Sequence, residues 1–364
     1  MIDSEHVMKK KGNGKTMELK KLLTELPAIM SITGYTKGNG DKLKALIGDA
    51  FDDNYTDAVG NHVFVRRCGK ENAPKIMIDT HFDEVGMMVT GVHEDGFLSV
   101  VNVGGLDMRI MQAAEVTVYG DGKEIYGVVV STPPHLTKPD EAKKLKEIGE
   151  LYIDTGYSKE ELEKYVHLGT PVGFRAIYRE LLNGKISGKA FDCKACGACA
   201  AYAVAITPRE ELAGDVYVVF SNFEETGARG GASNAAYVID PDYAMVADVT
   251  HAVMPGDSNK EPRQGDGISL TVAPITNRKL INMLMKEAKA KEMNIQRECV
   301  TRHTGTNTMT VNLALGGVPT VDVGLPLKNM HTYNEVVSTR DAESLAKLMT
   351  IFITSKDIAE EFGR

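Results

Sequence analysis

The 364-residue chain contains no tryptophan, no apolar run near the ~20 residues that cross a bilayer, and no excess of positive charge. Its 42 basic and 50 acidic residues give a net charge of -8, so the sequence offers no basic face for nucleic acid or for a membrane surface. With 43% hydrophobic residues the chain can bury a large core. We expect a cytoplasmic enzyme in which the polar residues 1–16, which lack a hydrophobic signal core, form a mobile extension.

Cysteine is also scarce, and its placement excludes a disulfide framework. The five cysteines are an odd number, and three of them crowd into Cys193, Cys196 and Cys199. This spacing resembles part of an iron–sulfur run, but the fourth ligand with its trailing proline is absent. In an alanine-rich helix such cysteines are more typical of small packing residues. An iron–sulfur or redox protein that uses this helix remains an alternative function of a different class.

Predicted helices and strands alternate over most of the chain. Helical spacing covers 17–26 (ended by Pro27), 41–51, 277–293 and 341–362, and apolar runs at 61–67, 75–79, 218–220, 243–248 and 269–274 indicate strands. From about 86 to 185 the pattern changes to short strands and tight turns. The sequence therefore predicts an α/β fold, a doubly wound domain with a mixed sheet made of residues 17–85 and 186–364. A small β domain, residues 86–185, is inserted into it and is interpreted as a structural module.

Two adjacent carboxylates, Glu224 and Glu225, follow a buried strand and precede a glycine-rich turn. In open α/β sheets ligands bind at the carboxyl ends of the strands. One carboxylate could bind a metal ion while the other handles a proton. The alternative is that both are solvated turn residues.

Other strand ends and one helix start carry similar groups. His81 follows the strand at 75–79, and Asp83 lies two positions on, where it could hold the second ring nitrogen of a ligating imidazole. Asp192 precedes the alanine-rich helix, as a cap or as a ligand. Asp248 ends the strand at 243–248, and His331 follows a later strand.

These two imidazoles and three carboxylates suit zinc, cobalt or manganese. If Asp192 bridges two ions, each ion receives one histidine, one terminal carboxylate and half of the bridge. Glu224 is then left beside the ions, where it could accept a proton from a water molecule.

Five motifs in this order resemble those of the tetrahedral, or glutamyl-aminopeptidase-like, dinuclear metallo-aminopeptidases. They are THFDEVG (80–86), GKAFD (188–192), NFEETGARG (222–230), ADVTHA (247–252) and MHTYNEVV (330–337). The resemblance implies a zinc-peptidase domain with an inserted PDZ-like β domain that mediates dimerisation, and dimers that assemble into dodecamers. It also implies two divalent metal ions per chain, zinc or cobalt and less commonly manganese, and peptide substrates.

By this resemblance, His81 and Asp248 would hold one ion, Glu225 and His331 the other, and Asp192 would bridge them. Glu224 would be the general base, and Asp83 would orient His81. The chain departs from the family pattern at Cys193 and Lys194, where an acidic residue and an arginine are usual, and at Asn307, where an aspartate is usual.

The predicted function is therefore a metal-dependent aminopeptidase that removes N-terminal residues from peptides. A related metal-dependent amidase or deacylase is the alternative within enzymes. A glucanase is disfavoured because no carboxylate pair lies beside an aromatic platform in a chain without tryptophan.

Overall fold

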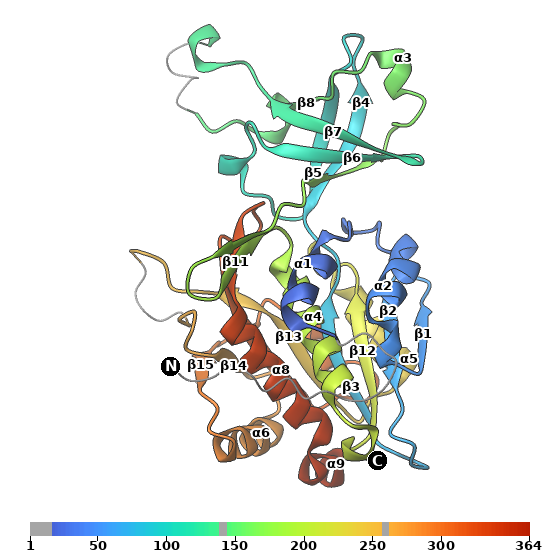
Figure 1. The fold of residues 1–364 in the computed structure, drawn as a ribbon, viewed down its shortest axis with the longest axis vertical. Coiled ribbons are helices and arrows are strands. Elements are labelled where there is room, and N and C mark those ends of the chain that lie inside the picture. The colour runs from blue at the N-terminus through green and yellow to red at the C-terminus, as the bar shows by residue number, and fades with distance from the viewer. Residues whose placement is uncertain (1–16, 138–143, 257–261) are drawn as a thin grey trace.

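The computed structural model describes residues 17–137, 144–256 and 262–364, and the predicted extension at 1–16 lies outside these ranges. The chain forms a large sheet flanked by helices and a smaller β-barrel beside it (Figure 1). Within these ranges no helix is long and apolar enough to cross a membrane.

The large sheet has eleven strands and a mixed topology, with the order β1-β2-β12-β3-β13-β16-β17-β11-β10 and with β14 and β15 attached through β16. Its centre is parallel, because β3 pairs in parallel with β12 and β13, and β13 with β16. The strands are β1 (Asp53–Thr56), β2 (His62–Arg66), β3 (Lys75–His81), β10 (Arg179–Leu181), β11 (Lys185–Gly188), β12 (Asp215–Ser221), β13 (Tyr243–His251), β14 (Ile268–Val272), β15 (Ile295–Cys299), β16 (Thr320–Lys328) and β17 (Glu335–Ser338). The central strands thus bring their carboxyl ends to one edge.

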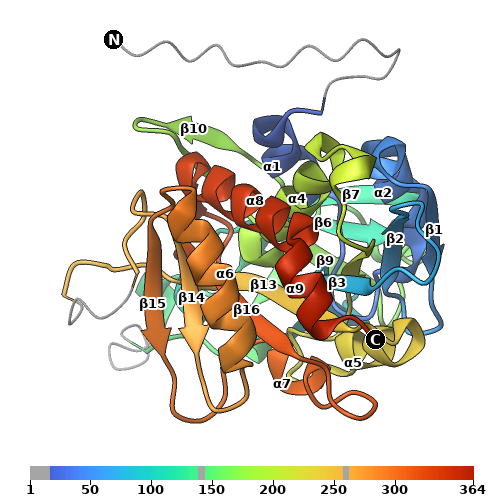
Figure 2. The same cartoon turned by 90° about the horizontal axis from the view of Figure 1, so that it is seen from below.

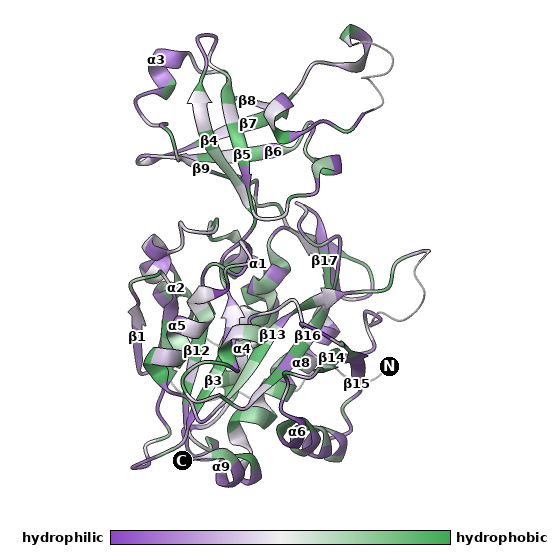
Figure 3. Cartoon of the chain, turned by 180° about the vertical axis from the view of Figure 1, so that it is seen from behind, coloured by the Kyte–Doolittle hydropathy of each residue, from purple (hydrophilic) through white to green (hydrophobic). Residues whose placement is uncertain are grey.

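Side chains alternate between two faces of this sheet, and both faces are covered by helices. In β12, Val216 and Val218 belong to one core, and Tyr217 and Val219 to the other. Figure 3 shows hydrophobic residues along such central strands. The first core is closed by α1 (Leu19–Ala28), α2 (Gly40–Ile47), α4 (Phe191–Ile206), α6 (Arg278–Ala290), α8 (Thr339–Thr354) and α9 (Lys356–Phe362), and the second by α5 (Gly230–Ile239) and α7 (Thr308–Val311). Figure 2 shows α6, α8 and α9 side by side on one face.

The barrel closes in the order β4-β5-β8-β7-β6-β9 around its own apolar core. Its elements are β4 (Gly86–Val92), β5 (Leu98–Val103), β6 (Glu115–Gly120), β7 (Lys123–Val130), β8 (Tyr152–Asp154), α3 (Lys159–Leu162) and β9 (Pro171–Phe174). The barrel strands thus end at Phe174. β10, which falls inside the predicted insertion, and β11, which begins at its last residue, pair within the large sheet, where β11 lies beside β17. The division of the chain into domains stays a prediction.

All four predicted helices have different bounds in the structure, and the one expected at 277–293 ends earlier, since α6 is Arg278–Ala290. α1 continues through Pro27, because a proline in the last turn forfeits only one backbone hydrogen bond. α2 begins at Gly40, and Asp41 lies in its first turn without capping it. The expected helix at 341–362 is two helices, because Ser355 leaves the helical conformation and accepts a hydrogen bond from the Ile358 N–H as the cap of α9.

Candidate metal centre

The five predicted metal ligands meet at the carboxyl edge of the parallel strands. His81 ends β3, Asp248 lies in β13, and Glu225 follows β12. Asp192 lies at the start of α4, and His331 lies between β16 and β17. Since β12, β3 and β13 are neighbours in the sheet, residues far apart in the sequence become close in space.

Asp192 lies between the two histidines. Its Oδ1 is 2.9 Å from His81 Nε2, and its Oδ2 is 3.4 Å from His331 Nε2. Each histidine also contacts a carboxylate of its own: His81 Nε2 is 3.5 Å from Asp248 Oδ1, and His331 Nε2 is 3.2 Å from Glu225 Oε2. The donors therefore form two sets that share Asp192.

The electrostatics of these groups fit a cation between them. Burial, and then the negative charge of Asp192, raise the pKa of Glu225 to about 7. Burial lowers the pKa of His331, but its hydrogen bonds to Asp192 and Glu225 outweigh this and raise it to about 11. Without a metal ion, a protonated imidazole supplies the positive charge that these carboxylates require. A metal ion would displace that proton and supply the charge instead.

Asp83 contacts His81 mainly through its backbone. His81 Nδ1 is 2.9 Å from the carbonyl oxygen of Asp83, whereas the nearest carboxylate oxygen is 3.7 Å away. The Asp83 carboxylate instead accepts hydrogen bonds from the hydroxyl of Thr33 and from the N–H groups of Glu224 and Glu225. The backbone carbonyl of Asp83 thus orients the His81 ring, and the Asp83 carboxylate holds the turn that contains Glu224 and Glu225.

Two contacts of His331 were not foreseen. Its Nδ1 lies 2.7 Å from the carbonyl oxygen of Gly105, in the segment that follows β5 of the barrel. Its backbone has a φ of 62° and is held by Glu335, which accepts the His331 N–H at 3.0 Å and the Phe191 and Asp192 N–H groups at 2.7 and 3.2 Å. The barrel, expected to be structural only, therefore contacts a candidate ligand.

Glu224, the expected base, is largely buried beside the ligand sets. Burial is the main cause that raises its pKa to about 8, and the charges of Asp248 and Glu225 add to it. Arg229 Nε donates to its Oε1 at 3.0 Å and lowers this pKa in part. The same guanidinium donates to the Gly305 carbonyl at 2.6 Å, which fixes it in place. A carboxyl group with a pKa near neutrality suits general acid–base work.

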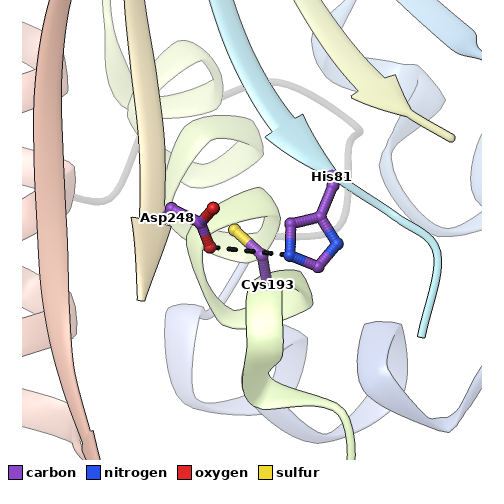
Figure 4. Close-up of side chains that lie close together, drawn as sticks. All are labelled: His81, Cys193 and Asp248. Carbon is purple, nitrogen blue, oxygen red and sulfur yellow. Dashed lines mark ion pairs between the residues drawn. The ribbon is translucent and has the colours of Figure 1, made fainter. Parts of the chain in front are cut away.

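The three cysteines of α4 are all fully buried, but they do not share one site. Cys193 Sγ donates to the carbonyl of Ala247, and Cys199 Sγ donates to that of Ala342. Among the described residues, two groups of His, Cys, Asp or Glu side chains lie close enough together to hold a metal ion. Cys193 belongs to one of these groups, and neither group contains a second cysteine. The packing interpretation therefore fits Cys199, while Cys193 lies beside His81 and Asp248 (Figure 4).

The other two departures from the family pattern have buried partners. Lys194 Nζ is 3.0 Å from Glu84 Oε1 and donates to the Ile29 carbonyl at 2.7 Å, and Lys189 pairs with the other oxygen of Glu84. Asn307 donates through Nδ2 to Asp79 Oδ2 at 2.9 Å and to Ser221 Oγ at 3.0 Å. Glu84, whose role the sequence did not indicate, thus pairs with two buried lysines next to Asp83.

Comparisons with known proteins agree with this geometry. The profile of the M42 glutamyl aminopeptidase family matches residues 60–348. A lysyl aminopeptidase of Pyrococcus furiosus is 32% identical over 91% of this chain and 94% of its own length. An aminopeptidase from Desulfurococcus kamchatkensis has a structure with a TM-score of 0.86 and 30% identity, over 95% of this chain and 98% of that one. The TET1 peptidase of Pyrococcus horikoshii, described as able to assemble into a tetrahedron or a large octahedral shell, has a TM-score of 0.81 and 25% identity, over 93% of this chain and 100% of that one. Together with the two donor sets that share Asp192, these matches establish that the chain belongs to the M42 glutamyl aminopeptidase family.

Proposed function

We propose that the chain is an aminopeptidase that removes N-terminal residues from peptides with two divalent metal ions. His81 and Asp248 would hold one ion, Glu225 and His331 the other, and Asp192 both. The observation that carries this proposal is the position of Asp192, which presents one carboxylate oxygen to each histidine. Nitrogen and oxygen donors of this kind suit zinc or cobalt, and also manganese.

The bound ions would polarise the carbonyl of the first peptide bond and lower the pKa of a water molecule towards 7. Glu224 accepts the proton of that water and later returns it to the leaving amine. The position of Glu224 next to Glu225, in the turn that follows β12, supports this role. Arg229 orients the Glu224 carboxylate, and Asp83 holds the backbone of the same turn.

The barrel would be the PDZ-like module of the family and would mediate dimerisation. The assembly described for the TET1 peptidase of Pyrococcus horikoshii supports a homo-oligomer, for which we propose dimers that build a dodecamer. We also propose a cytoplasmic location.

The test measures metal content and turnover together. The full-length chain is depleted of metal with a chelator, reloaded with zinc or cobalt, and assayed for release of amino acids from unblocked peptides. We expect two ions per chain, and activity that depletion abolishes and reloading restores. N-acetylated peptides should resist hydrolysis, and their cleavage would indicate a deacylase instead.

A matched pair of variants tests whether the metal ions bind at the proposed site. His331→Ala should bind fewer ions than the wild type, because it removes one of the two imidazoles. His167→Ala removes an imidazole of the barrel that pairs with Asp121, so its metal content should be unchanged. Two ions per chain in His331→Ala would refute the assignment.

A further inference from the structure

Cys193 lies inside the proposed metal centre. A sulfur atom of Cys193, a ring nitrogen of His81 and a carboxylate oxygen of Asp248 all lie within 4.8 Å of one another. The three residues come from α4, β3 and β13, and at most 7% of any of these residues is exposed. Figure 4 shows the sulfur on the side of α4 that faces the Asp248 carboxylate and the His81 ring.

The local backbone explains how Asp192 and Cys193 both reach the centre. Consecutive residues of a regular helix do not share a face. Here the start of α4 is not helical, since Asp192 has a ψ of 110° and Cys193 a φ of -104° with a ψ of 20°. Asp192 therefore contacts His81 and His331 while the next side chain also lies beside His81.

We infer that Cys193 is a thiolate ligand of the ion held by His81 and Asp248, an inference that rests on the proposed function. With Asp192, this ion would have one nitrogen, one sulfur and two oxygen donors, a four-donor set of the kind that zinc takes. The other ion would keep only His331, Glu225 and the shared carboxylate, and so would have one protein donor fewer.

Binding of the metal ion by Cys193 forms one covalent bond and breaks one. The sulfur–metal bond forms as the S–H bond breaks, the proton leaves to solvent, and the thiol gives up its hydrogen bond to the Ala247 carbonyl, 3.1 Å away. No oxidant or reductant is required. Because a thiolate is a soft ligand, this position should select zinc or cobalt(II) over manganese.

Cys199 provides a matched control in the same helix. Both thiols are fully buried and donate to a backbone carbonyl, Cys199 to Ala342 at 3.3 Å. Of these two cysteines, only Cys193 belongs to a group of possible metal-ligating side chains in the described part of the chain. Cys193→Ser and Cys199→Ser each replace a buried sulfhydryl by a hydroxyl that can make the same hydrogen bond.

Cobalt(II) is the probe, because thiolate ligation produces a charge-transfer band in the near-ultraviolet that oxygen and nitrogen donors do not. The metal-depleted full-length protein is titrated with cobalt(II) under a non-thiol reductant, while absorption and bound cobalt per chain are measured. We expect the band in the wild type and in Cys199→Ser, and its loss in Cys193→Ser. Affinity for one of the two ions should fall by at least about 10-fold in Cys193→Ser only.

The outcomes separate this inference from the proposed function. Two bound cobalt ions without the band, or a band that persists in Cys193→Ser, would overturn ligation by Cys193 and leave the dinuclear site intact. No bound cobalt in the wild type would overturn both. If Cys193→Ser does not fold, the wild-type spectrum still tests the inference, because two bound cobalt ions without the charge-transfer band would overturn it.

Discussion

The contact between the barrel and His331 can be tested with a single methyl group. A Cβ atom at Gly105 would lie 3.3 Å from His331 Nδ1 and 3.5 Å from its Cε1, so the ring or the barrel segment must move by a few tenths of an ångström. Gly105 has no left-handed φ, so alanine is compatible with its backbone. Gly105→Ala should therefore disturb the hydrogen-bond partner of His331, a proposed metal ligand, without unfolding the chain.

The expected magnitude follows from what such partners contribute. Complete loss of the acceptor of a ligating histidine would lower metal affinity by about 10- to 100-fold. Gly105→Ala keeps the carbonyl and only shifts it against the ring, so the lower end applies, about 10-fold or about 1.4 kcal/mol. We expect this loss for one of the two ions, measured by competition between the metal-depleted protein and a chromophoric chelator for zinc. Unfolding of the metal-free chain by urea should change by less than about 1 kcal/mol.

Gly91→Ala is the matched control, because an added Cβ in β4 of the same barrel meets no atom within 4 Å. It should bind both ions as the wild type does. If Gly105→Ala also binds both ions with wild-type affinity, the barrel does not position His331 and the reasoning fails.

Three further changes test other parts of the structure. Glu224→Gln should bind two ions and remain folded but lose at least about 100-fold in kcat, so near-normal turnover would exclude it as the base. Glu84→Gln removes the carboxylate that buried Lys189 and Lys194 share and should cost about 3 kcal/mol in urea unfolding, whereas Glu180→Gln breaks the exposed pair with Lys20 and should cost under about 1 kcal/mol; equal losses would contradict this difference. Burial raises the pKa of Asp322 from 3.8 to about 7, so the folded state keeps a proton that the unfolded state releases. Asp322 should then contribute up to about 4 kcal/mol to the stability that the metal-free wild type loses between pH 4 and 7, and Asp322→Asn should lack this contribution; parallel pH profiles of unfolding would refute it.

The strands and their functional ends could be predicted because their signals are local. A buried strand shows as an apolar run, and the carboxyl ends of parallel strands meet at one edge of the sheet. Five ligand positions follow from those rules together with the family motifs. The structure brings the side chains of His81, Asp192, Glu225, Asp248 and His331 close together, and their role as metal ligands stays a prediction.

The contacts that hold these ligands could not be predicted, because they join distant segments through the backbone. The Gly105 carbonyl and His331 are 226 residues apart, and any residue type carries a carbonyl, so the sequence holds no signal for this pair. Glu335 lies within a recognised motif, but its role depends on three N–H groups that only the fold brings together. The break at Ser355 was missed because the apolar stripe continues from α8 into α9.

The spread of the ligands along the chain has a consequence for its synthesis. At about 5–20 residues per second, roughly 10–50 s pass between the addition of His81 and that of His331. Throughout that interval a nascent chain carries His81 and later Asp192, Glu225 and Asp248, but it lacks the second imidazole and the Glu335 carboxylate that holds its backbone. The second donor set therefore cannot exist on a partial chain. A protein that hydrolyses peptides would in this way remain without its complete metal centre while it is still attached to the ribosome.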